Sequence, residues 1–486
     1  MPHLKFLFVL KMISVLLLII CGAMLVPTGM AVYYKEFAAV EGFIATICGV
    51  SILCGLYLLL TRKDKNKDFS VRDGFLFVTL SWLSVTVVGA LPCFLSGSIP
   101  LFTDAFFESM SGFSTTGATI LTDIESLPKS VLFWRALAHW LGGMGIVVLT
   151  VAVFPLMGIG GLQLIRAEAP GPTVDRLTPR IAETAKILWL IYIAFTAVET
   201  ILLMLCGVDA FNAITHSFST ISTGGLSPLN DSVGHFNSSK VDWIVTLFMF
   251  LSGVNFALHY RLFAGRSLSV FKDTELRIFI CVILAAAGLV CIDLYKHVYG
   301  TFEESLRYAL FQVTSIITTT GLTTANYDLW PNFSKVILLG LCFIGACSGS
   351  TGGGIKVMRI AILFKQAINE IKLLLHPRGV FVLRTGGGTV AKHIVYAISG
   401  FFFIYIANVL IVTFVVATSG ADILTSLSAA LATVGCVGIG FGEINPASNY
   451  AFFPNYVKWV LSFAMLIGRL ELYTVLVLFT PWFWKR

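Results

Sequence analysis

Four short threonine- or serine-rich elements, each carrying glycine, recur in this 486-residue chain at intervals of 97 to 114 residues between their glycines. In ion-selective pores, backbone carbonyls beside such residues replace the water around a cation. Glycine allows the left-handed backbone that points successive carbonyls inward. One pore-lining unit used four times explains the spacing. The elements read Ser114-Thr115-Thr116-Gly117, Ser222-Thr223-Gly224-Gly225, Thr318-Thr319-Thr320-Gly321 and Ala432-Thr433-Val434-Gly435.

The expected ion-binding residues are the threonine and glycine positions of these elements. In the second element, the choice between Gly224 and Gly225 stays open, and the fourth element is the poorest in threonine. The set is Thr115, Thr116, Gly117, Thr223, Gly224, Thr319, Thr320, Gly321, Thr433, Val434 and Gly435.

The elements must be positioned by membrane-spanning helices. The chain is 57% hydrophobic and 12% charged, whereas soluble domains carry about 25% charged residues. The net charge of +7 is modest and does not indicate nucleic-acid binding. The first apolar run is long and lacks a cleavage site, so we expect a retained helix. Ten runs are long enough to span a bilayer: 12–34, 42–61, 73–97, 131–156, 186–207, 241–263, 276–298, 334–368, 392–418 and 454–484.

A repeat of spanning helix, short re-entrant helix, polar turn and second spanning helix is expected from about residue 71. The short helices, near 102–113, 209–220, 303–316 and 422–432, are too brief to cross a bilayer. The prediction is an all-α polytopic protein with two N-terminal helices and four such repeats around a pseudo-fourfold pore. The expected divisions are 1–70, 71–160, 161–265, 266–370 and 371–486.

Lysine and arginine predict the orientation. One set of loops holds eighteen of them, including Arg62, Arg166, Arg261 and Lys365, and the opposite loops and span ends hold eight. Because basic residues favour the cytoplasmic side, the first set is expected to be cytoplasmic. An even number of spans then places both termini in the cytoplasm. The opposite loops are acidic, which either attracts cations or follows from the basic bias alone.

A gate is expected in the second spanning helix of the third repeat. Four of the seven residues from Ser348 to Gly354 are glycine, so a firm helix is not expected there. Arg469, in the middle of the last span, is a costly intramembrane charge that could hydrogen-bond this segment. Tight helix crossing is an alternative for the glycines, and snorkelling to the inner interface is an alternative for Lys356. The expected gate comprises Gly345, Ser348, Gly349, Ser350, Thr351, Gly352, Gly353, Gly354, Lys356 and Arg469.

This pattern resembles the Trk/Ktr/HKT superfamily of potassium transporters. The two extra N-terminal helices, the glycine-rich break and the arginine of the last helix are similar to its bacterial TrkH branch, over essentially the whole chain. The resemblance implies K⁺ at the filter, a gating loop partnered by Arg469, and no cofactor. It also implies a multi-pass protein of the bacterial inner membrane, a homodimer, and a TrkA-like nucleotide-binding subunit on the cytoplasmic side. In plant relatives a serine at the first filter glycine accompanies sodium transport, so Gly117 favours potassium.

Gated potassium uptake down the electrochemical gradient is therefore the expected function. An inside-negative potential supplies roughly 2.3 kcal/mol per charge per 100 mV. A K⁺ symporter coupled to H⁺ or Na⁺ is the alternative, for which Glu199, Asp293 and Glu471 are candidate carboxylates. An intramembrane enzyme is not expected, because no nucleophile elbow or HExxH motif is present.

Overall fold

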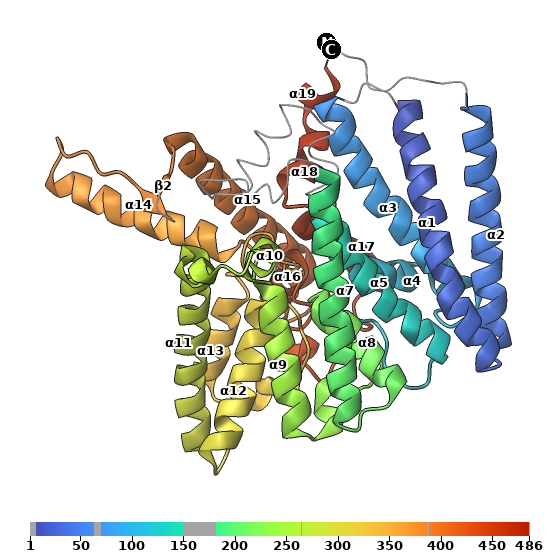
Figure 1. The fold of residues 1–486 in the computed structure, drawn as a ribbon, viewed down its shortest axis with the longest axis horizontal. Helices are drawn as coiled ribbons and strands as arrows, with labels where there is room; N and C mark the ends of the chain where they lie inside the picture. The colour runs from blue at the N-terminus through green and yellow to red at the C-terminus, as the bar shows by residue number, and fades with distance from the viewer. Residues whose placement is uncertain (1–5, 63–69, 149–180, 264, 386–387, 486) are drawn as a thin grey trace.

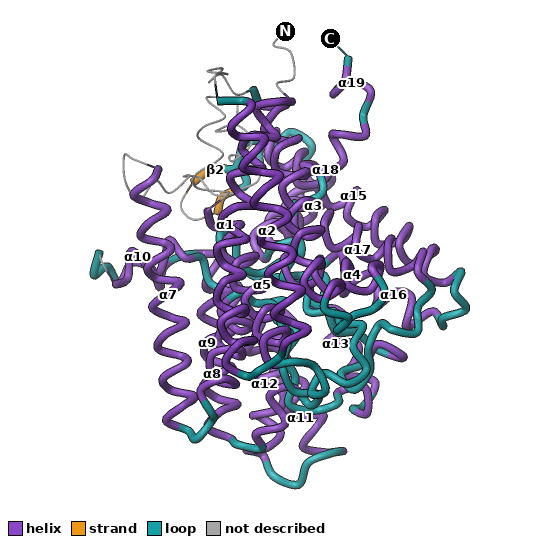
Figure 2. Tube along the Cα trace, turned by 90° about the vertical axis from the view of Figure 1, so that its right-hand side faces the viewer, coloured by secondary structure: helices purple, strands orange, loops and turns teal. Residues whose placement is uncertain are grey.

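The computed structural model describes residues 6–62, 70–148, 181–263, 265–385 and 388–485 (Figure 1). Within them the protein consists of helices and the loops that join them, and the described strands are confined to one two-stranded hairpin (Figure 2). The described residues do not include the end of the 131–156 run, the division at 160/161, or several basic residues of the loops predicted to be cytoplasmic, such as Arg166. The predicted all-α polytopic fold is confirmed.

Two long apolar helices, α1 (Phe6–Tyr33) and α2 (Phe37–Leu60), stand beside α3 at one edge of the molecule (Figure 1). Glu36, between them, holds the pair to the first repeat. Its carboxylate accepts the backbone N–H groups of Lys129 at 2.7 Å and Ser130 at 3.1 Å. These donors lie at the start of α5, where the first N–H groups of a helix have no partner within it. A side chain from the N-terminal pair therefore caps a helix of the pore region.

Each repeat begins with a long apolar helix followed by a short one. The long helices are α3 (Val71–Leu95), α7 (Ile181–Leu205), α11 (Thr274–His297) and α15 (Lys392–Ala417). The short ones, here called pore helices, are α4 (Phe102–Phe113), α8 (Ala210–Ile221), α12 (Phe302–Ile317) and α16 (Ile423–Val434).

Side chains fix the start of three pore helices. Asp209, Thr301 and Asp422 each accept a hydrogen bond from the backbone N–H three residues later, the usual N-terminal cap. Helices of 12 to 16 residues span roughly 18–24 Å at 1.5 Å per residue, short of the ~30 Å hydrocarbon core. They therefore end inside the membrane, as the sequence predicts.

The second helix of a repeat is interrupted in repeats two, three and four. In repeat two, α9 (Ser239–Gly253) and α10 (Phe256–Phe263) meet at 101°. In repeat three, α13 (Asn332–Leu341) and α14 (Val357–Leu375) are separated by an irregular loop. In repeat four, α17 (Asn455–Arg469) meets the segment Tyr473–Phe479, formed by α18 (Tyr473–Leu476) and η6 (Val477–Phe479), at 111°. The sequence indicated only the break in repeat three.

The second helix of repeat one, α5 (Lys129–Val148), is continuous as far as it is described. Among the described residues, six helices are long and apolar enough to cross a membrane, and up to eight spans result if each bent pair counts as one. With α5 and the interrupted α13–α14 segment, this is the arrangement of ten spans that the sequence predicts.

The remaining elements lie outside the pore repeats or join them. The strands β1 (Arg384–Thr385) and β2 (Gly388–Thr389) pair antiparallel. The helix α14 of repeat three projects from the body, and β2 lies beside it (Figure 1). The chain ends in α19 (Pro481–Trp484), and the Lys485 carbonyl accepts a hydrogen bond from Arg72 at 3.0 Å. Short 3₁₀ turns occupy the connections: η2 (Ser232–Phe236), η3 (Leu268–Lys272), η4 (Tyr327–Leu329) and η5 (Gly442–Ile444).

Candidate ion pathway

All four pore helices end in the same turn. The N–H of the second residue after the helix cap returns to the carbonyl five positions earlier, at 2.8–3.0 Å. This bond defines the Schellman ending, which satisfies carbonyls left open at a helix C-terminus. The four bonds run from Thr116 to Ser111, from Gly224 to Ser219, from Thr320 to Ser315 and from Val437 to Ala432.

The turns place non-glycine residues in the left-handed region, at Thr115 (φ 53°), Thr223 (52°), Thr319 (59°) and Cys436 (55°). Threonine is β-branched, so this conformation is unusual and costs on the order of 1–3 kcal/mol. Strain of this kind collects at functional sites. Two residues further on, a glycine also has a positive φ in every repeat, at Gly117 (85°), Gly225 (86°), Gly321 (79°) and Gly438 (82°).

The four turns form a closed ring. A Cβ atom on the glycine of one repeat would overlap the carbonyl oxygen that precedes the glycine of the next. The overlaps run from Gly117 to Gly224, from Gly225 to Thr320, from Gly321 to Val437, and from Gly438 back to Thr116.

Equivalent backbone atoms therefore meet in cyclic order, and only a hydrogen fits at each of the four Cα positions. Irregular backbone at membrane depth is tolerated where protein or water surrounds it. The ring satisfies this condition. Its segments, here called the turn ring, are 115–117, 223–225, 319–321 and 436–438.

The ring corrects the register of the fourth element. Thr433 and Val434 are the last residues of α16, and Gly435 is its cap with a right-handed backbone (φ −79°, ψ −10°). The Thr433 hydroxyl donates to the Ala429 carbonyl within the helix. Gly438, three residues after Gly435, stands where Gly117 stands in repeat one. In repeat two, Gly225 takes that position and Gly224 takes that of Thr116, so Thr115, Thr116, Gly117, Thr223, Gly224, Thr319, Thr320 and Gly321 all lie in the ring.

The glycine-rich loop of repeat three lies against three of the four turns. The Gly353 N–H donates to the Thr319 hydroxyl at 2.7 Å, and the Thr223 hydroxyl donates to that of Thr351 at 3.1 Å. A Cβ on Gly353 would also contact the Gly435 carbonyl and the Cys436 side chain. Within the loop, Gly345, Gly349 and Gly354 have positive φ values.

The loop is buried over most of its length, with Ser350, Thr351, Gly352 and Gly353 all shielded, whereas Gly349 is exposed. The N-terminal part of the loop contacts the end of α9 and the first turn of α11. Cys347 N–H donates to the Gly253 carbonyl at 3.0 Å, and Ser348 N–H donates to Glu275 at 2.7 Å. Glu275, on α11, is a loop contact that the sequence analysis missed, and no local motif announces it.

Arg469 joins the loop to a second part of the molecule. It is 2% exposed and lies at the end of α17, where the last span breaks. Its Nη1 donates to the Thr351 carbonyl and its Nη2 to the Gly142 carbonyl, both at 2.9 Å. One guanidinium thus connects the fourth repeat to the loop of the third and to α5 of the first.

The side chains of Lys356 and Glu471 have other partners than their local sequence suggests. Lys356 is 7% exposed, and its ammonium donates to the Gly352 carbonyl inside the loop, so snorkelling to the interface is wrong. Glu471 pairs with Arg359 at 2.6 Å, not with its near neighbour Arg469. Arg359 lies in the first turn of α14, directly after the loop, which makes this pair a second missed contact between repeats three and four.

Comparison with known proteins places the chain in a family. The family model of the TrkH cation transport proteins matches residues 37–485. The Trk system potassium uptake protein TrkH of Salmonella typhimurium is 42% identical over 480 residues, covering 98% of this chain and 99% of its own. The TrkG protein of Escherichia coli is 36% identical, with 95% of each chain covered. The chain belongs to the TrkH family.

A solved structure has the same fold. The crystal structure of the potassium transporter TrkH from Vibrio parahaemolyticus superposes with a TM-score of 0.90 at 39% identity, covering 99% of this chain and all of that one. Family and fold together define a multi-pass membrane protein that transports cations and is not an enzyme, in agreement with the sequence analysis.

Proposed function

We propose that this protein takes up potassium across the bacterial inner membrane through a gated filter lined by backbone carbonyls. The closed ring of four turns carries the proposal, because it brings equivalent backbone segments of four repeats to one axis. The family relatives described above are potassium uptake proteins by name, which supports K⁺ as the transported ion. The divisions at 70/71, 160/161 and 265/266 are proposed as repeat boundaries. The fourth, expected at 370/371, falls inside α14 (Val357–Leu375), so the third repeat is proposed to continue to the end of that helix.

The proposed filter is the turn ring, with K⁺ as the transported ion. Its residues are Thr115, Thr116, Gly117, Thr223, Gly224, Gly225, Thr319, Thr320, Gly321, Cys436, Val437 and Gly438. Carbonyls of these segments replace the ion's water. Each pore helix points its C-terminal end at the ring, and the partial negative charge there stabilises a cation.

The proposed gate is the loop Gly345–Lys356 together with Arg469. The loop bonds to the ring at Thr223 and Thr319, which supports a position on the path of an ion leaving the filter. Its positive-φ glycines allow it to change conformation at low cost. Arg469 holds it through the Thr351 carbonyl and adds a positive charge that opposes cation passage.

The basic loops support an orientation, and the resemblance to the TrkH branch supports an assembly. We propose that both termini are cytoplasmic, that two copies form a homodimer in the bilayer, and that a TrkA-like nucleotide-binding subunit regulates the gate. The helix α14 supports the last point, because it follows the loop directly and projects from the body with basic residues Lys365 and Lys372 (Figure 1).

Coupling to H⁺ is the second candidate, and one residue favours it. Asp293 accepts hydrogen bonds from Ser334, and Glu471 is paired with Arg359. Glu199, on α7, is fully buried, and its carboxyl group has the Thr220 side chain nearby but no cationic partner among the described residues. A buried carboxyl in a span that is not part of an ion pair is a candidate proton site. A reversal potential that shifts with pH, and no longer shifts in Glu199→Gln, would establish coupling.

Reversal potentials in proteoliposomes test the filter. Gly117→Ser and Gly438→Ser place a Cβ against a ring carbonyl and should lower the K⁺/Na⁺ permeability ratio. Gly420→Ser is the matched control, because Gly420 has a similar φ of +90° but no atom within 4 Å of its Cβ position. The filter assignment fails if folded Gly438→Ser protein keeps the wild-type ratio.

A further inference from the structure

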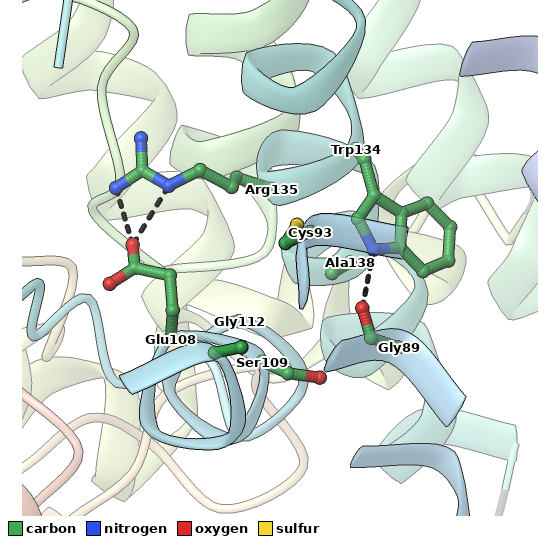
Figure 3. A pocket seen from close by; sticks show the side chains of 9 residues that line it. Gly89, Cys93, Glu108, Ser109, Gly112, Trp134, Arg135 and Ala138 are labelled. Atoms are coloured by element: carbon green, nitrogen blue, oxygen red, sulfur yellow. Dashed lines mark hydrogen bonds and ion pairs between the residues drawn. The ribbon is translucent and has the colours of Figure 1, made fainter. Parts of the chain in front are cut away.

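A buried ion pair joins the pore helix of the first repeat to α5, next to the turn ring. Glu108 on the pore helix α4 and Arg135 on α5 are 3% and 4% exposed, and Arg135 Nη2 lies 2.6 Å from Glu108 Oε1 (Figure 3). Arg135 Nε donates to the same oxygen at 2.8 Å. Both bonds of the guanidinium to the carboxylate therefore use Oε1, which leaves Oε2 for other donors.

The other donors lie in the polypeptide just after the ring glycine of repeat one. Segments in this position, immediately following a ring glycine, are here called ring exits. Ile120 N–H donates to Glu108 Oε2 at 3.1 Å, and the Thr119 hydroxyl lies 3.0 Å from Oε1 and 3.1 Å from Oε2. These residues follow Gly117 by two and three positions. The carboxylate thus ties the pore helix to the segment immediately beyond the first ring glycine.

The arginine extends the connection to the second repeat. Its Nη2 lies 3.2 Å from Thr119 Oγ1, and its Nη1 donates to the Ser227 carbonyl at 3.4 Å. Ser227 follows the second ring glycine, Gly225, by two positions. The pair therefore holds the exits of two neighbouring turns, 119–120 and 227, in fixed relation to each other.

In the described parts of the other three repeats, no ion pair occupies the equivalent position. Counting six residues back from each pore-helix cap, the equivalents of Glu108 are His216, Gln312 and Ala429. His216 bonds to Asn212 and Ser227 in its own repeat. The Gln312 amide is fully buried and makes no hydrogen bond within the described residues. Among the described residues, an ion pair that reaches the segments just after the ring glycines is found only at the boundary between repeats one and two.

Packing alone does not fix this pair. A small cavity, lined by residues such as Cys93, Ser109 and Ala138, adjoins it within the helix layer, and Trp134 on the far side bonds to the Gly89 carbonyl instead (Figure 3). Polar contacts with the ring exits therefore determine where the carboxylate and guanidinium sit. A buried ion pair contributes little net stability over an apolar pair, whereas fixed geometry is what a filter requires.

We propose that the Glu108–Arg135 pair positions the exits of the first two ring turns and thereby determines discrimination between K⁺ and Na⁺. Neither residue contacts the ion; both act through Thr119, Ile120 and Ser227. The inference rests on the proposed filter function. Thr119 is the most useful position for testing the proposal. Its hydroxyl contacts both Glu108 and Arg135, so replacing it weakens their connection to the segment after Gly117 without removing either charge.

Reversal potentials under K⁺/Na⁺ gradients measure the proposed effect. Thr119→Val removes the hydroxyl and leaves the ion pair, and we expect the K⁺/Na⁺ permeability ratio to fall by roughly fivefold, the equivalent of one hydrogen bond. Thr119→Ser keeps the hydroxyl and should keep the ratio. Glu108→Gln, with its weakened bonds to Arg135 and Ile120, should lower the ratio at least as far.

The pair Asp242–Arg307 supplies the control. It is also buried, with 2.9 Å between Arg307 Nη1 and Asp242 Oδ2, and joins α9 to the pore helix α12, but among the described residues its hydrogen bonds do not reach the ring or its exits. Asp242→Asn should reduce stability without changing the ratio. The inference is overturned if Thr119→Val keeps the wild-type ratio, or if Asp242→Asn lowers it equally. If Glu108→Gln does not fold, Thr119→Val decides. Wild-type protein without K⁺ selectivity would instead refute the proposed filter itself.

Discussion

Replacing Arg469 separates two ways in which it can restrict ion flow. A charge near the pathway repels cations whatever its shape. A guanidinium that donates to both Thr351 and Gly142 also holds the loop in place. Arg469→Ala removes both effects. Arg469→Lys keeps the charge, but an ammonium does not reproduce the planar fork that reaches two carbonyls.

The contacts set the size of the expected change. A hydrogen bond from a charged donor contributes about 1.5–3 kcal/mol. Losing the bond to Thr351 alone would shift the balance between the closed and open loop by roughly 10- to 150-fold. Where the closed loop dominates, potassium flux should rise by about the same factor in Arg469→Ala. Arg469→Lys should recover part of the closure, because one of the two bonds can still form.

Flux of ⁸⁶Rb⁺ or K⁺ into proteoliposomes at equal protein density measures this change. Lys458→Ala is the matched control, since it also removes a buried cation from α17, but one that pairs with Asp104 at 2.7 Å, away from the loop. Unaltered flux in folded Arg469→Ala protein would refute the proposal that Arg469 holds the loop closed. Wild-type flux in Arg469→Lys would show that charge alone, without the bonds to the loop, forms the barrier.

Two further predictions concern the connections between repeats. Glu36→Gln weakens the cap on α5 and should cost about 1 kcal/mol, seen as a lower melting temperature by fluorescence-detected size exclusion, whereas Glu41→Gln, at an exposed position, should not. Arg359→Met and Glu471→Gln should each lower the free energy of unfolding by roughly 1–3 kcal/mol, less than for a fully buried pair because the Glu471 side chain is 32% exposed. The double variant should lose less stability than the sum of the two single losses. Strictly additive losses would contradict a direct interaction between the two residues.

The pore helices were predictable because capping residues and apolar periodicity are local. All four begin and end within about two residues of the expected positions. The fourth ring element could not be predicted in the same way. Thr433-Val434-Gly435 matches the sequence pattern of the other elements, but Thr433 and Val434 belong to α16 and Gly435 caps it. Only the end of the helix determines which residues enter the turn. Gly435-Cys436-Val437-Gly438 looks unlike the other three elements, although its backbone is the same.

The broken helices show the same limit. Gly253 and Asn255 are recognisable end signals for α9, and they were available in the sequence. The break after Arg469 has no glycine or proline; Glu471 and Leu472 adopt positive φ values of 54° each. Glu471 is held there by Arg359, 112 residues away. A conformation fixed by so distant a partner cannot be inferred from local sequence.

A ring closed by one polypeptide has a genetic consequence that a tetramer of identical subunits lacks. A substitution in a tetrameric pore is copied into every quadrant, so a harmful change is multiplied fourfold. Here a mutation alters one quadrant and leaves three intact. Cysteine in place of threonine at position 436, and a charged pair that reaches the ring exits of repeats one and two, are variations that such a gene can carry and refine separately.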